Sequence, residues 1–278
     1  MSALILSALK LLQFGHVTRR YQSRSALYLD HNMRLHFFAF LALQFLITVP
    51  TAVLFTNEVL LFVNEHRNGW YGTASYFWAR TIVELPLCLA VSVGYGLIAY
   101  HLSNQINDTS RAGKYVGVLC LASLTAQGIG LLIGTLAHSK ANLANVMSVG
   151  VYLFNLLLCG FFAPLDNLPP AISWAQYLSF SKQTYELEMY VIYGSDRCPD
   201  GLVSKALIIL DIQDYSATEL NLYILIAHLV LVRITAFFFL VCKANHYKLE
   251  QLIYKLKVLM RCCASRCGGS SRLVEDTV

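Results

Sequence analysis

The chain has 278 residues, of which 56% are hydrophobic and 13% charged, and its mean hydropathy is +0.54. Ordinary soluble domains carry about 25% charged residues, so this composition argues against a soluble globular protein and indicates a membrane protein. The formal charge of +5 comes from basic residues scattered over loops and the C-terminal tail, a pattern that argues against a nucleic-acid partner and favours contact with membrane lipids of the inner leaflet.

The N-terminal segment is apolar from Ala3 to Phe14, which is too short to cross a hydrocarbon core that needs about 20 helical residues. It is either the core of a signal peptide or the second part of a longer span. The basic residues Arg19, Arg20 and Arg24 follow it where a small-residue cleavage site would be expected. Residues 1–34 are thus a short apolar segment and a basic loop, and both alternatives stay open from the residues alone.

Five later stretches are long and apolar enough to cross a membrane as helices, each of about 17 to 25 residues. The predicted spans cover about residues 37–55, 81–102, 115–136, 144–162 and 220–242. The predicted fold is an all-α polytopic membrane protein whose membrane domain covers residues 35–242. The protein is expected to be a multi-pass integral membrane protein.

A charged, glycine-punctuated segment over residues 58–80 connects the first two of these spans. Because both neighbours cross the membrane, this segment must hold their ends at one face of the bilayer. We expect helical parts at about 58–65 and 73–80 with a turn between them.

The connection over residues 163–219 is long, and loops longer than about 12 to 15 residues usually have structure or function of their own. Within it, Ile172 to Tyr193 is predicted to form one or two short amphipathic helices at the membrane interface. Its aromatic side chains suit the headgroup level; they are Trp174, Tyr177, Tyr185 and Tyr190.

The C-terminal tail, residues 243–278, begins with a basic stop and continues with apolar residues at helical spacing. A helix lying on the cytosolic membrane surface is the prediction, and an exposed polar tail is the alternative. Adjacent Cys262 and Cys263 are candidates for S-acylation. No histidine lies near them at metal-ligand spacing, so no metal site is predicted.

Two ionisable residues, Glu84 and Arg233, fall inside predicted spans, where an unpartnered charge is costly and usually faces protein or water. Glu84 can pair with Arg80 four residues earlier on the same helix. Arg233 lies deeper in its span, and a direct substrate role is the alternative for both. The sequon at Asn107 is a candidate glycosylation site close to the membrane.

The segment Asn64-Glu65-His66-Arg67-Asn68-Gly69-Trp70-Tyr71-Gly72 resembles the first intracellular loop of ATP-binding cassette half-transporters of the G subfamily, the White and sterol-exporter type. The resemblance continues through the glycines of residues 128–134, Cys159-Gly160-Phe161-Phe162, the prolines that follow, and Arg233. It covers roughly residues 35–248 and implies an ABC-2 type membrane domain with five complete spans and a partial first one.

The resemblance implies roles for three groups of residues. The loop would contact a nucleotide-binding domain through Glu65, His66, Arg67, Trp70, Tyr71 and Arg80, although Trp70 and Tyr71 could simply anchor the interface. A substrate cavity between two copies would be lined by Phe37, Phe38, Leu41, Phe45, Val149, Tyr152, Leu153 and Leu156, for which ordinary packing between spans is the alternative. Phe161 and Phe162 would form a hydrophobic gate above it.

The chain contains neither a Gly-x-x-x-x-Gly-Lys-Ser/Thr phosphate loop nor a Leu-Ser-Gly-Gly-Gln motif. We therefore expect no catalytic, cofactor-binding or metal-binding residues on it, with ATP and Mg²⁺ held by a nucleotide-binding domain elsewhere and the family domain truncated at its N-terminus. The expected function is the membrane subunit of a dimeric lipid, sterol or lipophile exporter, in the plasma membrane by family default or in an internal membrane. The alternative is a non-transporting product that pairs with complete half-transporters and regulates them.

Overall fold

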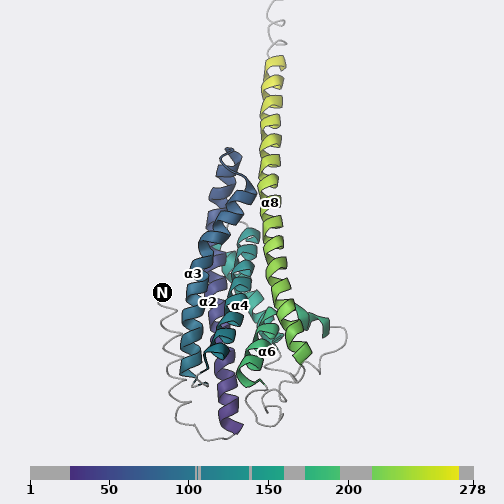
Figure 1. The fold of residues 1–278 in the computed structure, drawn as a ribbon. Helices are drawn as coiled ribbons and strands as arrows, with labels where there is room; N and C mark the ends of the chain where they lie inside the picture. The colour runs from purple at the N-terminus through teal and green to yellow at the C-terminus, as the bar shows by residue number, and fades with distance from the viewer. Residues whose placement is uncertain are drawn as a thin grey trace, which may run out of the picture.

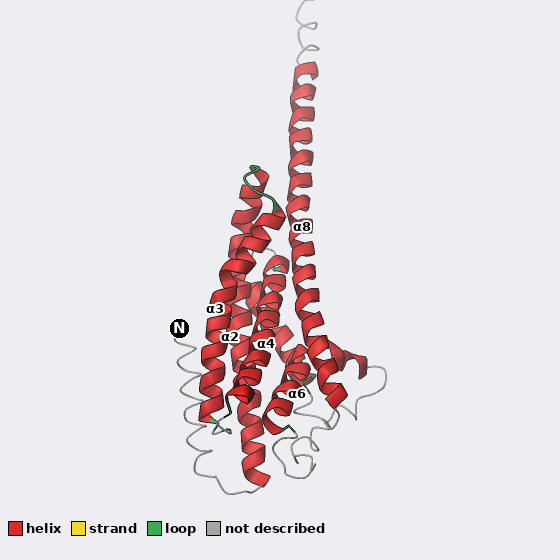
Figure 2. Ribbon diagram, in the orientation of Figure 1, coloured by secondary structure: helices red, strands yellow, loops and turns green. Residues whose placement is uncertain are grey.

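The computed structural model describes residues 26–103, 105, 108–137, 140–159, 173–194 and 215–268, with side chains described for all of these except 26–31, 173, 175, 215–217 and 247–268. In these ranges every regular element is a helix (Figures 1 and 2). The α-helices are α2 (Ala26–Arg67), α3 (Thr73–Leu102), α4 (Thr109–Leu136), α5 (Ala141–Leu157), α6 (Phe180–Tyr193) and α8 (Tyr215–Gly268), and η2 (Ser173–Leu178) is a 3-10 helix.

Four described helices, α2, α3, α4 and α8, are long and apolar enough to cross a membrane. They contain the predicted spans 37–55, 81–102, 115–136 and 220–242, which supports an all-helical, multi-pass membrane protein. The helix α5 has 17 residues and is shorter than the other four, while residues 160–162 of its predicted span lie outside the described residues. The structure therefore confirms four of the five predicted spans by length, and the predicted partial first span over residues 3–14 also lies outside the described residues.

The centre of the bundle is the contact between α2 and α4, which depends on glycine. A Cβ added at Gly130 would lie 2.8 Å from Cβ of Thr51 and 2.9 Å from the Thr48 carbonyl oxygen, and one at Gly134 would lie 2.9 Å from Cβ of Phe55. Thr48 Oγ1 also donates to the Ala126 carbonyl oxygen at 3.2 Å. Small residues let two membrane helices approach closely enough for such backbone contacts, so these glycines set the distance between α2 and α4.

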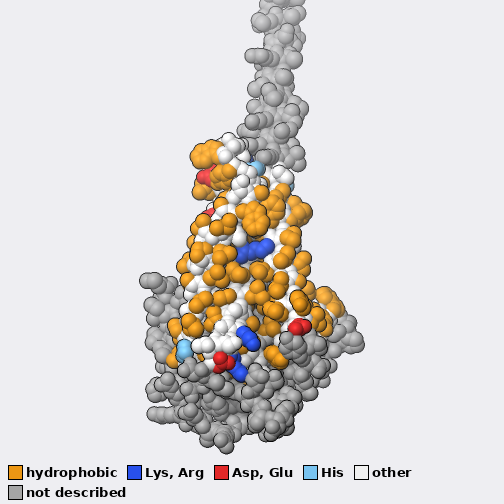
Figure 3. Space-filling view, viewed as in Figure 1, with side chains coloured by type: hydrophobic (Ala, Val, Ile, Leu, Met, Phe, Trp, Pro, Cys, Tyr) orange, Lys and Arg blue, Asp and Glu red, His pale blue; other side chains and the backbone are white. Residues whose placement is uncertain are grey.

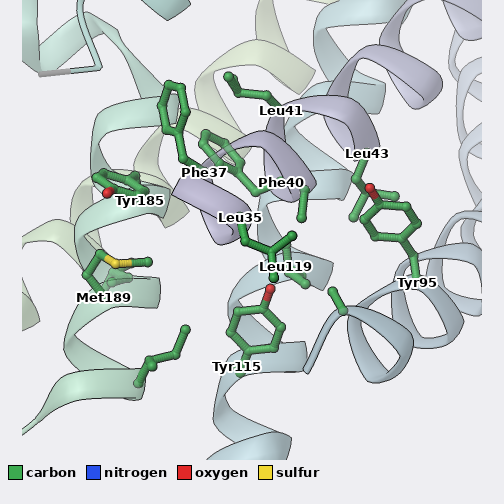
Figure 4. Packing of buried hydrophobic residues seen from close by; sticks show 14 of the residues in the cluster. Leu35, Phe37, Phe40, Leu41, Leu43, Tyr95, Tyr115, Leu119, Tyr185 and Met189 are labelled. Carbon is green, nitrogen blue, oxygen red and sulfur yellow. The ribbon is translucent and has the colours of Figure 1, made fainter. Parts of the chain in front are cut away.

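The helix α6 lies inside the bundle, and this corrects the prediction of a helix on the membrane surface. Phe37 of α2 contacts Tyr185 edge-to-face at 5.3 Å between ring centroids, and Figure 4 shows Tyr185 and Met189 of α6 beside Phe37 and Phe40. Tyr185 is 1% exposed and Met189 fully buried. The apolar surface that the sequence pattern assigned to the headgroup region instead packs on α2, while Trp174 and Tyr177, before α6, remain exposed.

The helix α8 runs without a break from the final span into the predicted tail and extends well beyond the rest of the bundle (Figure 1). The basic residues after Cys242 therefore do not end the helix, in contrast to the prediction of a separate surface-lying segment. On the face shown in Figure 3, hydrophobic side chains cover most of the described surface. Exposed apolar residues of α3 and α8, such as Ile82, Val83, Leu231 and Phe238, suit contact with lipid chains.

Candidate functional site

The turn that joins α2 to α3 is short and closed by backbone hydrogen bonds. The Gly69 N–H donates to the His66 carbonyl oxygen at 3.1 Å, and the Trp70 N–H donates to the Glu65 carbonyl oxygen at 3.3 Å. Gly69 has φ +78°, the left-handed conformation that glycine adopts without steric cost. This is a Schellman C-cap, and it reduces the non-helical part of the predicted 58–80 segment to residues 68–72.

Polar and aromatic side chains rigidify this turn. The Tyr71 hydroxyl donates a hydrogen bond to the Glu65 carboxylate, and His66 Nδ1 lies 2.8 Å from the Tyr71 carbonyl oxygen. Burial, followed by the hydrogen bond to Glu65, raises the pKa of Tyr71 to about 12, so the hydroxyl keeps its proton and remains the donor. Phe62 stacks on Tyr76 with ring centroids 4.3 Å apart and on His66 at 5.5 Å.

These contacts separate the predicted loop residues into two groups. Glu65, His66 and Tyr71 make contacts within the turn, and their contact with a partner domain stays a prediction. Arg67 is exposed and Trp70 is 71% exposed. The exposed tip of the hairpin therefore consists of Arg67 to Trp70, a cation and a large aromatic side chain that the turn holds outward.

Arg80 joins the two arms of the hairpin below the turn. Its Nη1 lies 3.1 Å from Oε2 of Glu58 on α2, and its Nη2 lies 2.5 Å from Oε1 of Glu84 on α3. The second contact is the pair that the four-residue spacing predicts, whereas the contact with Glu58 depends on how α2 and α3 pack. The side chains of Arg80 and Glu84 are only 20% and 16% exposed, so both ion pairs are stronger than typical surface pairs.

The network continues from the hairpin to α4 and α8. Gln127 Nε2 of α4 donates to Glu84 Oε2 at 2.8 Å, while Gln127 Oε1 accepts from Arg233 Nη2 at 2.6 Å. Arg233, on α8, also donates to Thr81 Oγ1 at 3.3 Å and to the Leu124 carbonyl oxygen at 3.4 Å. One amide side chain thus orients a carboxylate and a guanidinium on different helices, and we call Glu58, Arg80, Glu84, Gln127 and Arg233 the inner network.

The inner network contains two carboxylates and two guanidinium groups, so its formal charges cancel. Glycine makes room for it, because a Cβ at Gly128 would lie 3.1 Å from Cγ1 of Val232 and 3.5 Å from Nε of Arg233. Directly after the predicted end of the last span, Lys243 Nζ donates to the Thr135 carbonyl oxygen at 3.0 Å, at the end of α4. Hydrogen bonds therefore tie α8 to α4 at two levels.

Sequence analysis missed Gln127, Thr81 and Glu58 as network members. Glutamine and threonine are uncharged, so they do not stand out in an apolar run. The contacts of Gln127 with Glu84 and of Thr81 with Arg233 join residues 43 and 152 positions apart. The available signal was the polarity of Gln127 itself in the middle of a predicted span, because a buried amide needs partners for both its donors and its acceptor.

The predicted substrate-cavity residues divide between the surface and the interior of the bundle. On α2, Phe38 and Phe45 are 51% and 37% exposed, whereas Phe37 is fully buried and Leu41 is 2% exposed. Phe37 and Leu41, four residues apart on α2, pack in the core of the chain itself. Their place in a cavity between two copies stays a prediction.

On α5, Val149 and Leu153 are 36% and 50% exposed, and Tyr152 and Leu156 are half-buried against the core. Tyr152 contacts Phe45 edge-to-face, with ring centroids 5.2 Å apart. Phe38, Phe45, Val149 and Leu153 therefore present apolar side chains at the surface of adjacent helices, and we call these four residues the α2–α5 face.

Other predicted sites are not described. Phe161, Phe162 and Asn107 lie outside the described residues, and Cys262 and Cys263 lie in α8 where side chains are not described. Among the described residues, no group of three or more His, Cys, Asp or Glu side chains could hold a metal ion. A cavity of about 300 Å³ lies between the end of α3 and the start of α4, near Tyr100 and Asp108, away from the α2–α5 face.

Comparison with known proteins matches residues 1–193 to the family described as ABC-2 type transporter. ABC transporter G family member 14 of Arabidopsis thaliana is 31% identical over 142 residues, which are 51% of this chain and 22% of that protein. Protein white of Drosophila melanogaster is 30% identical over 189 residues, 62% of this chain and 26% of that protein.

The Broad substrate specificity ATP-binding cassette transporter ABCG2 of Mus musculus is 25% identical over 154 residues, 55% of this chain and 23% of that protein. The matched segments thus span about a quarter of the length of these relatives. The family match covers more than half of the chain and agrees with a bundle of long apolar helices. The chain therefore belongs to the ABC-2 type transporter family, and it carries the membrane domain of an ABC transporter.

Proposed function

We propose that the chain is the membrane subunit of an ATP-driven exporter of lipids, sterols or other lipophiles, working as a dimer by alternating access. A nucleotide-binding domain outside this sequence supplies ATP hydrolysis and holds ATP and Mg²⁺. The observation that carries the proposal is the α2–α3 hairpin, whose closed tip presents Arg67 and Trp70 outward and whose base is joined to α4 and α8 by the inner network.

The hairpin suits the transmission of force because its parts are fixed to one another. The tip is a Schellman cap supported by a stack of aromatic rings, so it moves as one body. A displacement of the tip reaches Arg80 and Glu84, then Gln127 and Arg233, through hydrogen bonds no longer than 3.1 Å. Closure of a nucleotide-binding domain against the tip would therefore tilt α3 together with α4 and α8.

The apolar character of the α2–α5 face supports the proposal that the substrate is lipophilic. Phe38, Phe45, Val149 and Leu153 are apolar, and the described residues place no charged side chain among them except Arg34, one turn before Phe38. Burying apolar area stabilises a complex by about 25 cal/mol per Å², so two such faces in a dimer can bind a flat apolar molecule between them. The mouse relative's description as a broad-specificity transporter is consistent with a site that relies on apolar contact.

Co-expression tests this function. The tagged full chain is produced with a complete G-subfamily half-transporter, the pair is purified through the tag, and ATP-dependent export of a fluorescent sterol is measured in vesicles. We expect a stable pair whose export falls at least several-fold in the double variant Phe45→Ala, Leu153→Ala. The matched control is Leu87→Ala, an exposed apolar residue on α3, which should export normally.

The proposal would be overturned if a stable pair forms but exports no faster than an inactive partner alone. In that case the pair with the double variant would also export at the same rate. Failure of the two proteins to co-purify would overturn the dimer part of the proposal. The plasma membrane is the proposed location, and surface labelling of cells that express the tagged chain tests it against an internal membrane.

A further inference from the structure

Glu188 of α6 is a buried acid without a cation beside it. The side chain is 0% exposed, and neither carboxyl oxygen has a hydrogen-bond partner among the described residues. Glu186, two positions earlier on the same helix, is handled differently: it lies 3.5 Å from Lys182 Nζ and accepts from Asn221 Nδ2 of α8 at 2.6 Å. One face of α6 thus neutralises its acid by pairing, and the other does not.

Four α-helices, α2, α4, α5 and α8, pack against α6, and the described groups near Glu188 are aromatic or neutral. Tyr95 of α3 and Tyr115 of α4 are the described titratable groups that interact with it electrostatically, and Tyr152 of α5 interacts with Tyr95. From α2, His36 faces Tyr115, and from α8, Asn221 reaches Glu186. Figure 4 shows Tyr95, Tyr115 and Tyr185 among the buried side chains of the core.

A cation of α4 reaches α6 but is engaged by a backbone carbonyl oxygen. Arg111, one turn before Tyr115, donates through Nη1 to the Ile192 carbonyl oxygen at 3.0 Å, one turn beyond Glu188 on α6. Burying an ionised carboxylate without a partner costs far more than burying the protonated acid. Glu188 lies on the short helix α6, outside the membrane-spanning helices. Burial raises the pKa of its carboxyl group well above the ordinary value.

A chain of polar groups runs from this region to the outer end of the bundle, where α2 begins and α3 ends. The Tyr115 hydroxyl lies 3.0 Å from His36 Nδ1, and Gln105 Nε2 lies 3.2 Å from His36 Nε2. Gln105 is partly buried and follows the end of α3. A histidine can take up and release a proton near neutral pH, and the amide of Gln105 holds the imidazole ring in place.

We propose that Glu188 is a proton-binding site inside the bundle and that it exchanges protons with the outer end through Tyr115 and His36, whose ring Gln105 holds in place. The step is an acid–base equilibrium: the carboxyl group releases a proton toward Tyr115 and His36 and becomes a carboxylate. The charge that remains has no partner in the present arrangement of helices, so deprotonation favours any other arrangement that brings a cation or water to Glu188. The inference is independent of the proposed transport function.

Infrared spectroscopy of the full chain in lipid nanodiscs tests the protonation state. At pH 7 we expect the C=O stretching band of a protonated carboxyl group, well above the ordinary glutamic acid pKa of about 4.3. The band should be absent in Glu188→Gln and present in the matched control Glu186→Gln. Labelling glutamate with ¹³C shifts the band in the unaltered protein, which assigns it to glutamate without any variant.

Two further readouts separate a proton site from a purely structural acid. In D₂O, the band should exchange at least tenfold more slowly in the double variant His36→Gln, Tyr115→Phe than in the unaltered chain. The unfolding temperature of the unaltered chain should fall relative to Glu188→Gln as pH rises above about 4.3, because the unfolded state then releases a proton that the folded state retains. A missing glutamate band at pH 7, or equal pH dependence in both proteins, would overturn the site; equal exchange rates would overturn the route.

Discussion

Two regions of the bundle bury carboxyl groups in opposite ways. In the inner network, Glu58 and Glu84 both contact Arg80, and Gln127 joins Glu84 to Arg233. Around Glu188, the described residues offer phenols and no cation. An acid with a partnered charge fixes the geometry of the helices that hold it, whereas an acid without one becomes sensitive to protons.

The difference matches the position of each region in the bundle. The inner network lies at the base of the hairpin that we propose to contact a nucleotide-binding domain, where a rigid connection between helices is useful. The Glu188 region lies near the opposite end, beside the α2–α6 contact that Phe37 and Tyr185 form. Removing Arg80 from the inner network and replacing Glu188 should therefore have different effects on the free energy of unfolding.

The largest effect is expected from Arg80→Met. The substitution leaves Glu58 and Glu84 near each other without their shared cation, so the free energy of unfolding should fall by about 3 kcal/mol, the lower end for a broken buried pair. The lower end applies because Glu58 is 38% exposed. Unfolding by a denaturing detergent measures the change.

The control for Arg80→Met is the double variant Arg80→Met, Glu84→Met, which removes the stranded carboxylate and should recover part of the loss. At pH 7, Glu188→Gln should be neutral or stabilising in the same assay. Equal losses from Arg80→Met and Glu188→Gln would show that the two regions are not built differently.

A smaller effect is expected from Gly130→Ala, which tests the helix contact between the two regions. The added Cβ would lie 2.9 Å from a backbone carbonyl oxygen of α2, so the helices must separate. Overpacking of this kind costs about 2 kcal/mol. Gly117→Ala on the same helix is the matched control, because no atom lies within 4 Å of its added Cβ, and a loss as large as that of Gly130→Ala would contradict the close contact.

Tyr71→Phe should have a smaller effect still. It removes the hydrogen bond to Glu65 while keeping the aromatic stack with Phe62, and the loss of one such bond costs about 1 kcal/mol. Hydrogen exchange of the backbone amides of residues 66–71 should accelerate, while amides of α6 remain unchanged. Acceleration throughout the bundle would contradict a local role for this bond.

Much of the fold follows from composition and apolar length, because a span needs little more than about 20 residues without charge. The Arg80–Glu84 pair is predictable for a similar local reason, since residues four apart on a helix are neighbours. Glu58 and Gln127 could not be assigned to the same network, because their contacts depend on the relative rotation of α2, α3 and α4.

Helix rotation also decides which of the predicted cavity residues lie at the surface of the chain. Phe37 and Phe38 are adjacent in an apolar run, and no local pattern decides which of them faces the core. The location of α6 was mispredicted because its aromatic residues suit both a membrane interface and a protein core. Glu188 was not singled out, since its burial depends on where α6 packs.

The central claim is that the tip of the α2–α3 hairpin is the contact surface for a nucleotide-binding domain. A photoreactive amino acid at Trp70, in the full chain co-expressed with a complete G-subfamily half-transporter, tests it by mass spectrometry of the cross-linked peptides. Position Leu97, exposed in the outer half of α3, is the matched control. We expect cross-links from position 70, and not from position 97, to peptides of the nucleotide-binding domain. Cross-links from position 70 to membrane-helix peptides alone would contradict the proposed contact surface.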